Sequence, residues 1–302
     1  MKQTQPLVSV IIATYNSSAF ILEALESVKE QTYSPIELIV TDDGSRDQTV
    51  AICRSWMDAH QNRFHKAMVV TTPVNTGTCQ NLNRALEQAG GEWLKFFAGD
   101  DKLYPTCLEQ FVAATREHPG GEVFFCNQLV NGASTPVSSE LRTFFNLEAP
   151  EQYRQLLKNS ILPAACNFLK HTAVTQVRAF DVEYRLFDDY PFFVKLLKQG
   201  HRFYHVDQPL VYYRIHENNV SHRQEINPVY FNDIRLFFER VYLKELWRNS
   251  LYFHLLHYLY QYVILVLVSR RMIRTHRWYD RLLTWGGPLF WKNRLGKRLN
   301  LA

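Results

Sequence analysis

The chain has 302 residues, enough for one large domain or two modest ones. Hydrophobic residues make up 46% and charged residues 21%, with 12 Gly and 12 Pro, so the composition excludes disordered, collagenous and low-complexity proteins. The net charge of +5 is uneven: residues 1–228 carry 21 Lys and Arg against 25 Asp and Glu, whereas residues 229–302 carry 13 against 4. A basic tail behind an acidic body indicates contact with an anionic surface.

The N-terminus and the cysteines bear on the compartment. Residues 1–13 lack the small-residue cleavage site of a secretory signal peptide. The cysteines are odd in number and never in Cys-x-x-Cys spacing, which argues against a disulfide framework and a zinc site. We therefore expect the body of the protein to stay in the cytoplasm, in a reducing environment.

The first hundred residues alternate strand and helix patterns. Strands are expected at 7–13, 36–41, 68–72 and 93–97, with helices of period 3.6 between them. This alternation predicts an α/β fold with a largely parallel sheet, whose binding crevice lies at the carboxyl ends of the strands. Further along we expect strands at 123–130, 203–206 and 210–213 and a mobile loop at 131–150. An apolar helix with Phe192, Phe193, Leu196 and Leu197 is expected after Asp188 and Asp189.

A polar segment follows each of the first four strands. The four segments are ATYNSS at 13–18, DDGSRD at 42–47, NTG at 75–77 and GDD at 99–101. No Gly-x-Gly-x-x-Gly or Walker motif is present, which excludes the usual dinucleotide and P-loop sites. Two acidic pairs at one edge would repel each other, so we expect Mn²⁺ or Mg²⁺ held together with a substrate diphosphate. For Asp42 the alternative is an Asx turn or a helix cap.

Four segments together resemble glycosyltransferase family 2, the inverting nucleotide-sugar transferases of GT-A fold. They are VSVIIATYN at 8–16, DDGSRDQT at 42–49, the stretch from Asn75 to Asp101, and YYRIHENNVS at 212–221. The likeness covers roughly residues 6–225, and four motifs in order are more specific than one. One position departs from the family pattern, because Ala98 stands where the first acid of Asp-x-Asp-Asp is usual.

The resemblance implies roles for the residues that follow the first three strands. Tyr15 would stack on the nucleobase, and Asp43 would accept a hydrogen bond from it, as an aromatic face and a carboxylate can do with uracil. Thr14 and Asn75 are further candidates for contact with the nucleotide. For these two residues a turn or capping role is an equal alternative.

The resemblance also assigns the remaining acids. Asp101 would bind the metal ion, with Asp100 beside it towards the ribose or the diphosphate. Asp189 would be the general base that takes the proton of the acceptor hydroxyl, supported by Asp188. The alternative for Asp189 is an acid that stabilises the start of a helix through the macrodipole.

Arg214 and His216 lie on alternate residues of an extended segment and therefore on one face. Beside a diphosphate they are expected to bind phosphate or the metal, as similar motifs of the family do. The Gln-x-x-Arg-Trp motif of processive members is absent, which favours transfer of a single sugar.

The tail contains an uncharged stretch at 249–269 followed by Arg270, Arg271, Arg274 and Arg277. The stretch has a polar face of His254, His257 and Gln261 and an apolar face of Leu251, Leu255, Tyr258, Tyr262 and Leu265. Attachment to an anionic membrane surface ranks first. Packing on the catalytic body or on a second copy, as a homodimer, comes next, then a membrane span, and nucleic acid is not expected.

The sequence therefore predicts a GT-A catalytic domain at 1–228 and a helical basic and aromatic region at 229–302. The expected function is transfer of one sugar from a UDP-linked donor to a lipid-linked saccharide acceptor in surface polysaccharide assembly, at the inner face of the cell membrane. A sugar-1-phosphate nucleotidyltransferase is less favoured, because it would need a Gly-rich, basic loop after the first strand. A catalytically weak scaffold or lipid-surface binding protein is the other alternative.

Overall fold

The computed structural model describes residues 5–134, 137–217, 219 and 227–269. The contacts between residues divide the chain into two units. The first unit consists of Met1–Leu156 and Ser160–Ile215, and the second of Leu157–Asn159 and His216–Ala302. The second unit thus begins earlier in the chain than the boundary at 228, and that composition-based division stays a prediction.

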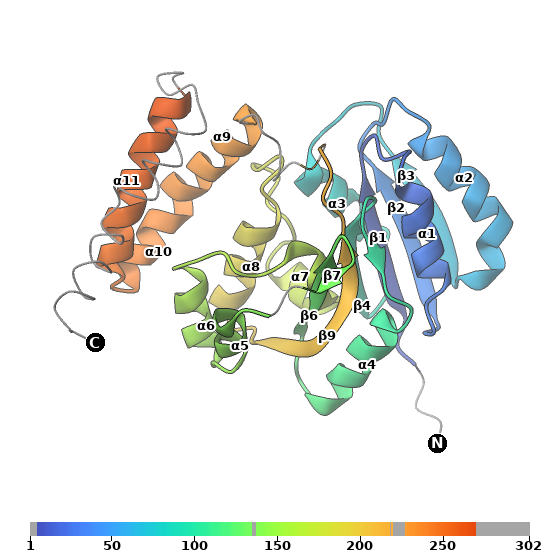
Figure 1. Ribbon diagram of the computed structural model, residues 1–302, viewed down its shortest axis with the longest axis horizontal. Coiled ribbons are helices and arrows are strands. Elements are labelled where there is room, and N and C mark those ends of the chain that lie inside the picture. Colours follow the sequence, from blue (N-terminus) through green and yellow to red (C-terminus); the bar gives the residue numbers. More distant parts are fainter. Residues whose placement is uncertain (1–4, 135–136, 218, 220–226, 270–302) are drawn as a thin grey trace. The chain divides into compact units, whose positions relative to one another are not determined.

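One sheet runs through the first unit (Figure 1). Its described strands are β1 (Val8–Thr14), β2 (Ile36–Asp42), β3 (Lys66–Thr71), β4 (Trp93–Ala98), β5 (Lys102–Leu103), β6 (Val123–Val130), β7 (Ala133–Ser134), β8 (Asn167–Lys170) and β9 (Phe203–Tyr213). The strand order is β3-β2-β1-β4-β8-β6-β9-β5, with β7 paired to β6.

The first half of the sheet is parallel, as the sequence predicts. β3, β2, β1 and β4 are parallel neighbours, and nearly every residue of β1 and β2 is buried on both faces. Thr14 lies opposite Asp42, and Ala13 lies opposite Ala98. The polar loops that follow β1, β2 and β4 therefore leave the sheet at the same level.

Helices connect and cover the strands. They are α1 (Ile21–Lys29), α2 (Thr49–His60), α3 (Thr78–Leu86), α4 (Cys107–Glu117), α5 (Ser139–Phe145), α6 (Ala149–Leu156), α7 (His171–Gln176) and α8 (Asp189–Lys198). The chain moves outward from β1 to β3 and then returns past β1 to β4. With right-handed crossovers, this reversal puts α3 on the face opposite α1 and α2. The reversal point between β1 and β4 is where such sheets bind ligands.

The second half of the sheet differs from the expectation in three ways. The two strands expected at 203–206 and 210–213 are one strand, β9. It pairs parallel with β6, and the register of the pairing shifts between Cys126 and Gln128. The expected mobile loop at 131–150 holds β7, α5 and the start of α6. β8 was not expected, and it pairs antiparallel with both β4 and β6.

The second unit is helical over its described part. Its elements are α9 (Pro228–Phe237), a π-helical turn at Phe238–Tyr242, α10 (Leu243–Arg248) and α11 (Tyr252–Ser269). The Tyr242 hydroxyl donates to the Leu157 carbonyl at 2.5 Å, and the Tyr258 hydroxyl donates to the Lys158 carbonyl at 2.7 Å. These bonds tie residues 157–159 to the helices.

The expected apolar face of the tail helix is partly visible in α11. Leu251 is buried just before the helix, and the rings of Tyr258 and Tyr262 lie 5.6 and 6.1 Å from the Phe238 ring. None of the helices that the structure describes is long and apolar enough to cross a membrane. The expected basic cluster at 270–277 lies outside the described residues.

Candidate active site

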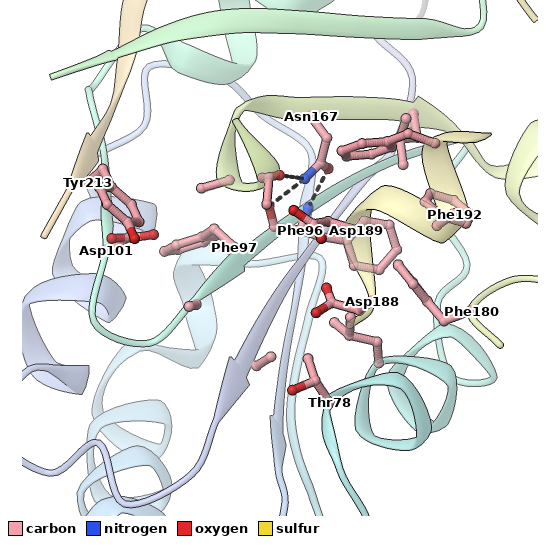
Figure 2. Close-up of a pocket in the computed structure, with 17 residues that line it drawn as sticks. Thr78, Phe96, Phe97, Asp101, Asn167, Phe180, Asp188, Asp189, Phe192 and Tyr213 are labelled. Carbon is pink, nitrogen blue, oxygen red and sulfur yellow. Dashed lines mark hydrogen bonds between the residues drawn. The ribbon is translucent and has the colours of Figure 1, made fainter. Parts of the chain in front are cut away.

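A cavity of about 220 Å³ lies at the carboxyl ends of β1 and β4 in the first unit (Figure 2). Its polar lining comes from Thr78, Asn167 and three carboxyl groups, those of Asp101, Asp188 and Asp189. The rest of the lining is apolar or aromatic: Ala13, Leu82, Phe96, Phe97, Ala98, Ala164, Ala165, Leu169, Phe180, Phe192, Phe193 and Tyr213. Three acids therefore share a largely apolar chamber, which disfavours their charged forms.

Asp101 lies just beyond β4 and is 3% exposed. Its Oδ1 accepts a hydrogen bond from the backbone N–H of Arg214 at 2.9 Å. Burial, with a smaller contribution from the charge of Asp100, raises the pKa of Asp101 to about 7, against the opposing effects of the Arg214 N–H and of the Lys95 and Arg214 cations. A cation bound beside Asp101 would favour its charged form and lower this pKa.

Asp188 and Asp189 lie at the start of α8. Asp189 is the first residue of the helix, and its Oδ1 accepts a hydrogen bond from the N–H of Tyr190 at 2.7 Å. Burial raises the pKa of both groups, and the charge of Asp189 raises the pKa of Asp188 further. The helix start is compatible with the macrodipole alternative for Asp189, while its place in the cavity favours a role in chemistry.

The carboxyl groups of the cavity fit a divalent metal ion that is bound together with substrate. Asp101 offers the oxygen ligand that Mn²⁺ and Mg²⁺ prefer, and a cation would offset the cost of ionising it. Within the described part of the chain, no group of three or more His, Cys, Asp or Glu side chains lies close enough to hold a metal ion. A metal here would therefore complete its coordination with water or with oxygen atoms of a bound diphosphate.

The first acidic pair, Asp42 and Asp43, is held by internal hydrogen bonds. Asp42 forms the Asx turn considered from the sequence, since its Oδ1 accepts from the N–H groups of Gly44 and Ser45 at 3.1 and 2.9 Å. The Thr14 hydroxyl donates to its Oδ2 at 3.0 Å. Protein donors therefore solvate the Asp42 carboxylate, and the expected role of a cation between the two acidic pairs stays a prediction.

Asp43 forms hydrogen bonds with Thr76 and Gly77 in the loop that follows β3. Its oxygens accept from the N–H groups of Thr76 and Gly77 at distances of 2.7–3.0 Å and from the Thr76 hydroxyl at 2.6 Å. These donors fill most of the acceptor positions of a carboxylate. A nucleobase would have to share or replace one of them, and the base-reading role of Asp43 stays a prediction.

Thr14, the last residue of β1, and Tyr15, the residue after it, lie in different environments. Tyr15 is 47% exposed, as a ring that stacks on a ligand requires, whereas Thr14 is buried with its hydroxyl on Asp42. The Asn16 side chain accepts from the Arg46 N–H at 2.9 Å, and the Asn16 N–H donates to Ser45 at 2.7 Å. These bonds brace the loop that presents Tyr15.

Asn75 contacts a residue that the sequence did not single out. The Arg185 guanidinium donates to the backbone carbonyl and to the side-chain Oδ1 of Asn75, both at 3.2 Å. The backbone carbonyl of Arg185 accepts from the Thr78 N–H at the start of α3. Gly77 has φ +98°, and a Cβ there would lie 2.6 Å from that carbonyl oxygen, so only glycine fits.

Arg214 holds the acidic loop in place. Its Nε donates to the Asp100 carbonyl at 2.9 Å, and its Nη2 donates to Glu23 of α1 at 2.9 Å. The guanidinium also lies 4.9 Å from the Phe20 ring centroid. His216 belongs to the second unit, where its N–H donates to the Asn219 side chain at 2.6 Å. The expected phosphate or metal contacts of both residues stay predictions.

Lys95 is a buried charged residue that was not predicted from the sequence to belong to the site. It lies in the middle of β4, is 0% exposed, and its Nζ donates to the carbonyls of Ala165 and Phe96. Its charge lowers the pKa of Asp101. The sequence did contain a sign of this role, because Lys95 interrupts the otherwise apolar run WLKFF. A cation buried in such a strand requires hydrogen-bond partners or a nearby negative charge.

Two glycosyltransferases of Bacillus subtilis are similar to this chain in sequence. The chain is 29% identical over 223 residues to the putative teichuronic acid biosynthesis glycosyltransferase TuaG of Bacillus subtilis, covering 73% of this chain and 84% of TuaG. It is 25% identical over 227 residues to the putative glycosyltransferase EpsH of the same organism, covering 73% of this chain and 64% of EpsH.

Solved structures share the fold. S. aureus TarS 1–349 in complex with UDP-GlcNAc matches with a TM-score of 0.62 and 24% identity, over 76% of this chain and 64% of that one. The mannosyltransferase PcManGT of Pyrobaculum calidifontis in complex with GDP-Man and Mn²⁺ matches with a TM-score of 0.58 and 19% identity, over 79% and 64%. These matches confirm the GT-A fold. Since the family model for glycosyl transferase family 2 matches residues 9–182, more than half of the chain, this protein belongs to glycosyltransferase family 2.

Proposed function

We propose that this protein is an inverting, non-processive glycosyltransferase that moves one sugar from a UDP-linked donor to a saccharide acceptor. The observation that carries the proposal is the cavity at the carboxyl ends of β1 and β4, where Asp101 and Asp189 line one chamber. One acid follows a sheet strand and the other starts a helix. Together they can serve the two ends of a displacement, the leaving group and the incoming hydroxyl.

The donor would bind through the loops that follow β1, β2 and β3. The exposed Tyr15 ring would stack on the base, with Asp43, Thr14 and Asn75 around the nucleoside. A UDP-linked donor is proposed because a fold relative, TarS, has been solved with UDP-GlcNAc and with UDP. Base stacking tolerates any nucleobase, so the choice of UDP rests on that likeness.

The diphosphate would lie beside Asp101. Asp101 would hold Mn²⁺ or Mg²⁺, with Asp100, Arg214 and His216 as further contacts to the metal or the donor. When bound, the metal would neutralise charge on the departing diphosphate. The Arg214 N–H and guanidinium keep the loop of both acids in place for this role.

Asp189 would act as the general base. The acceptor hydroxyl attacks the anomeric carbon on the face opposite the diphosphate, its proton passes to Asp189, and the C–O bond to the diphosphate breaks. The configuration at the anomeric carbon is therefore inverted. Burial raises the pKa of Asp189, which makes its carboxylate a stronger base, and Asp188 would support it.

The acceptor is proposed to be a lipid-linked saccharide in surface polysaccharide assembly. TuaG is named for teichuronic acid biosynthesis, which supports this choice. The basic chain at 270–302 would hold the enzyme on the inner face of the cell membrane, where such an acceptor is accessible.

The test is a screen of nucleotide sugars with the purified full chain and Mn²⁺, in which release of the nucleoside diphosphate is measured. We expect release from one UDP-sugar, reduced roughly a hundredfold in Asp189→Asn at unchanged donor affinity. Asp58→Asn, an exposed acid on α2, is the matched control and should leave release unchanged. If no nucleotide sugar is turned over and UDP does not bind, the result favours the alternative, a catalytically weak scaffold or lipid-surface binding protein.

A further inference from the structure

The outward face of α11 is apolar. Tyr252, Leu256, Leu259 and Val263 follow one another at intervals of four, three and four residues, and so lie on one side of the helix. They are between 39% and 55% exposed, and Phe253 beside them is 53% exposed. We name these five residues the outer face of α11. An apolar stripe of this kind on a surface helix marks an interaction site.

Packing within the second unit fixes which side of α11 points outward. The Tyr258 ring lies 4.9 Å from the Tyr242 ring, and the Tyr262 hydroxyl donates to Glu239 at 2.6 Å. These contacts hold a different side of α11, roughly a third of a turn from the stripe, against the preceding helices of the same unit (Figure 1). The outer face is therefore additional to the apolar surface that the unit uses for its own core.

The composition of the outer face matches the interfacial layer of a bilayer. Trp247, at the end of α10, is 63% exposed and meets the Tyr252 ring edge-on at 5.4 Å. Tryptophan and tyrosine concentrate where headgroups meet acyl chains, and aliphatic residues fill the deeper positions. Residues 249–269 contain no charged side chain, so none would be forced into the apolar layer.

The charge of the residues after α11 favours a membrane over a second copy of the chain as the partner of the outer face. Residues 270–302 contain nine Lys or Arg and one Asp. This charge attracts anionic headgroups, about 1 kcal/mol for each basic residue near the surface. Two copies joined through α11 would instead bring two such chains together, and like charges repel.

We propose that the outer face of α11 inserts into the headgroup and acyl boundary of an anionic lipid bilayer, with the helix lying in the membrane plane. The proposal rests on the membrane attachment in the proposed function and deepens it, because it adds a defined apolar contact to the electrostatic one. The proposal does not depend on the catalytic roles proposed for residues of the first unit.

The first experiment is flotation of the full chain with vesicles of phosphatidylcholine, with and without phosphatidylglycerol. Wild type should float with the anionic vesicles. Leu256→Gln combined with Leu259→Gln should bind at least about tenfold more weakly, because two leucines that would enter the bilayer are lost without a change of charge. Leu22→Gln, an exposed leucine of α1, is the matched control and should float like wild type. Circular dichroism and UDP affinity check that the variants are folded.

The second experiment reports the depth of the helix directly. The five native cysteines are all buried, so a thiol introduced by Leu259→Cys can be labelled selectively with an environment-sensitive fluorophore. Its emission should shift to the blue with anionic vesicles, and the same label at Leu22→Cys should not respond. A label at position 259 that stays in water while the protein floats would overturn the insertion and leave only the attraction of the basic chain.

Two other results would also overturn the proposal. If wild type is a dimer that Leu256→Gln with Leu259→Gln dissociates, the occupant of the outer face is a second copy. If the protein ignores anionic vesicles at low salt, the membrane attachment fails together with the insertion. Release of nucleoside diphosphate from a nucleotide sugar in either case would keep the transferase assignment intact.

Discussion

Replacing Asp101 with asparagine tests the electrostatics of the cavity without a substrate. The Asp101 carboxyl is almost fully buried, and its pKa is raised to about 7 by burial and by Asp100. A group whose pKa is raised on folding favours the folded state only below its unfolded pKa, near 4 for aspartate. Its contribution is lost as the pH rises through about 7. The asparagine side chain cannot ionise, so Asp101→Asn should escape this loss.

The size of the effect follows from the pKa difference. A rise of about three units corresponds to about 4 kcal/mol of destabilisation by the ionised group at pH 8, at about 1.4 kcal/mol per unit. At pH 5 the wild-type group is mostly protonated in the folded state, and the same calculation gives less than about 2 kcal/mol. The stability gap between Asp101→Asn and wild type should therefore widen by about 2–3 kcal/mol between pH 5 and pH 8.

Thermal unfolding of the metal-free protein, in the presence of a chelator, measures this gap. At roughly 2–4 °C per kcal/mol, the difference in Tm should widen by roughly 5–10 °C from pH 5 to pH 8. Mn²⁺ with UDP at pH 8 should raise the Tm of wild type and leave Asp101→Asn nearly unchanged. Asp58→Asn, an exposed acid, controls for the loss of a charge. A Tm difference that does not depend on pH would refute the reasoning.

Three further substitutions test other parts of the site. Tyr15→Ala should weaken UDP binding about 5- to 100-fold in calorimetry, the value of one stacked base, whereas Tyr15→Phe should keep it; equal losses in both would rule out stacking. Gly77→Ala should lower Tm by more than Gly120→Ala, because both have positive φ but only the Cβ at Gly77 would meet a backbone, at 2.6 Å; equal losses would show that this close contact does not matter. Lys95→Met should raise the pKa of Asp101 further and shift the pH dependence of Mn²⁺-stimulated UDP binding upward, and an unchanged profile would remove Lys95 from the electrostatics of the cavity.

The parallel half of the sheet was predictable because its signals are local. β1 and β2 are continuous β-branched runs buried on both faces, and their predicted bounds differ from the observed ones by at most one residue. The polar loops follow from the same rule, since parallel strands end at one edge. This part of the argument needs no knowledge of distant contacts.

The antiparallel half depends on partners far away in the chain. β8 has four residues and is a strand only because β4 and β6 flank it. β9 stays one strand through the expected break because a bulge in the pairing with β6 absorbs the irregularity. Neither feature has a periodicity that a sequence window would show.

The site shows the same division between local and distant information. Motif positions placed Asp101, Asp188 and Asp189, and the cavity brings these three together. The apolar wall from Phe96, Phe180, Phe192 and neighbouring residues looked like ordinary core in the sequence. The internal bonds of Asp43 were also hidden, because they depend on a loop 33 residues further along the chain.

Calorimetry with UDP tests most directly whether the cavity binds a metal-assisted nucleoside diphosphate. Wild type should bind UDP more tightly with Mn²⁺ than with a chelator, and Asp101→Ala should bind equally weakly in both conditions. Asp58→Ala, on the surface of α2, should behave like wild type. We expect Asp101→Ala, but not Asp58→Ala, to lose the effect of Mn²⁺ on UDP binding. UDP binding that still depends on Mn²⁺ in Asp101→Ala would contradict the account.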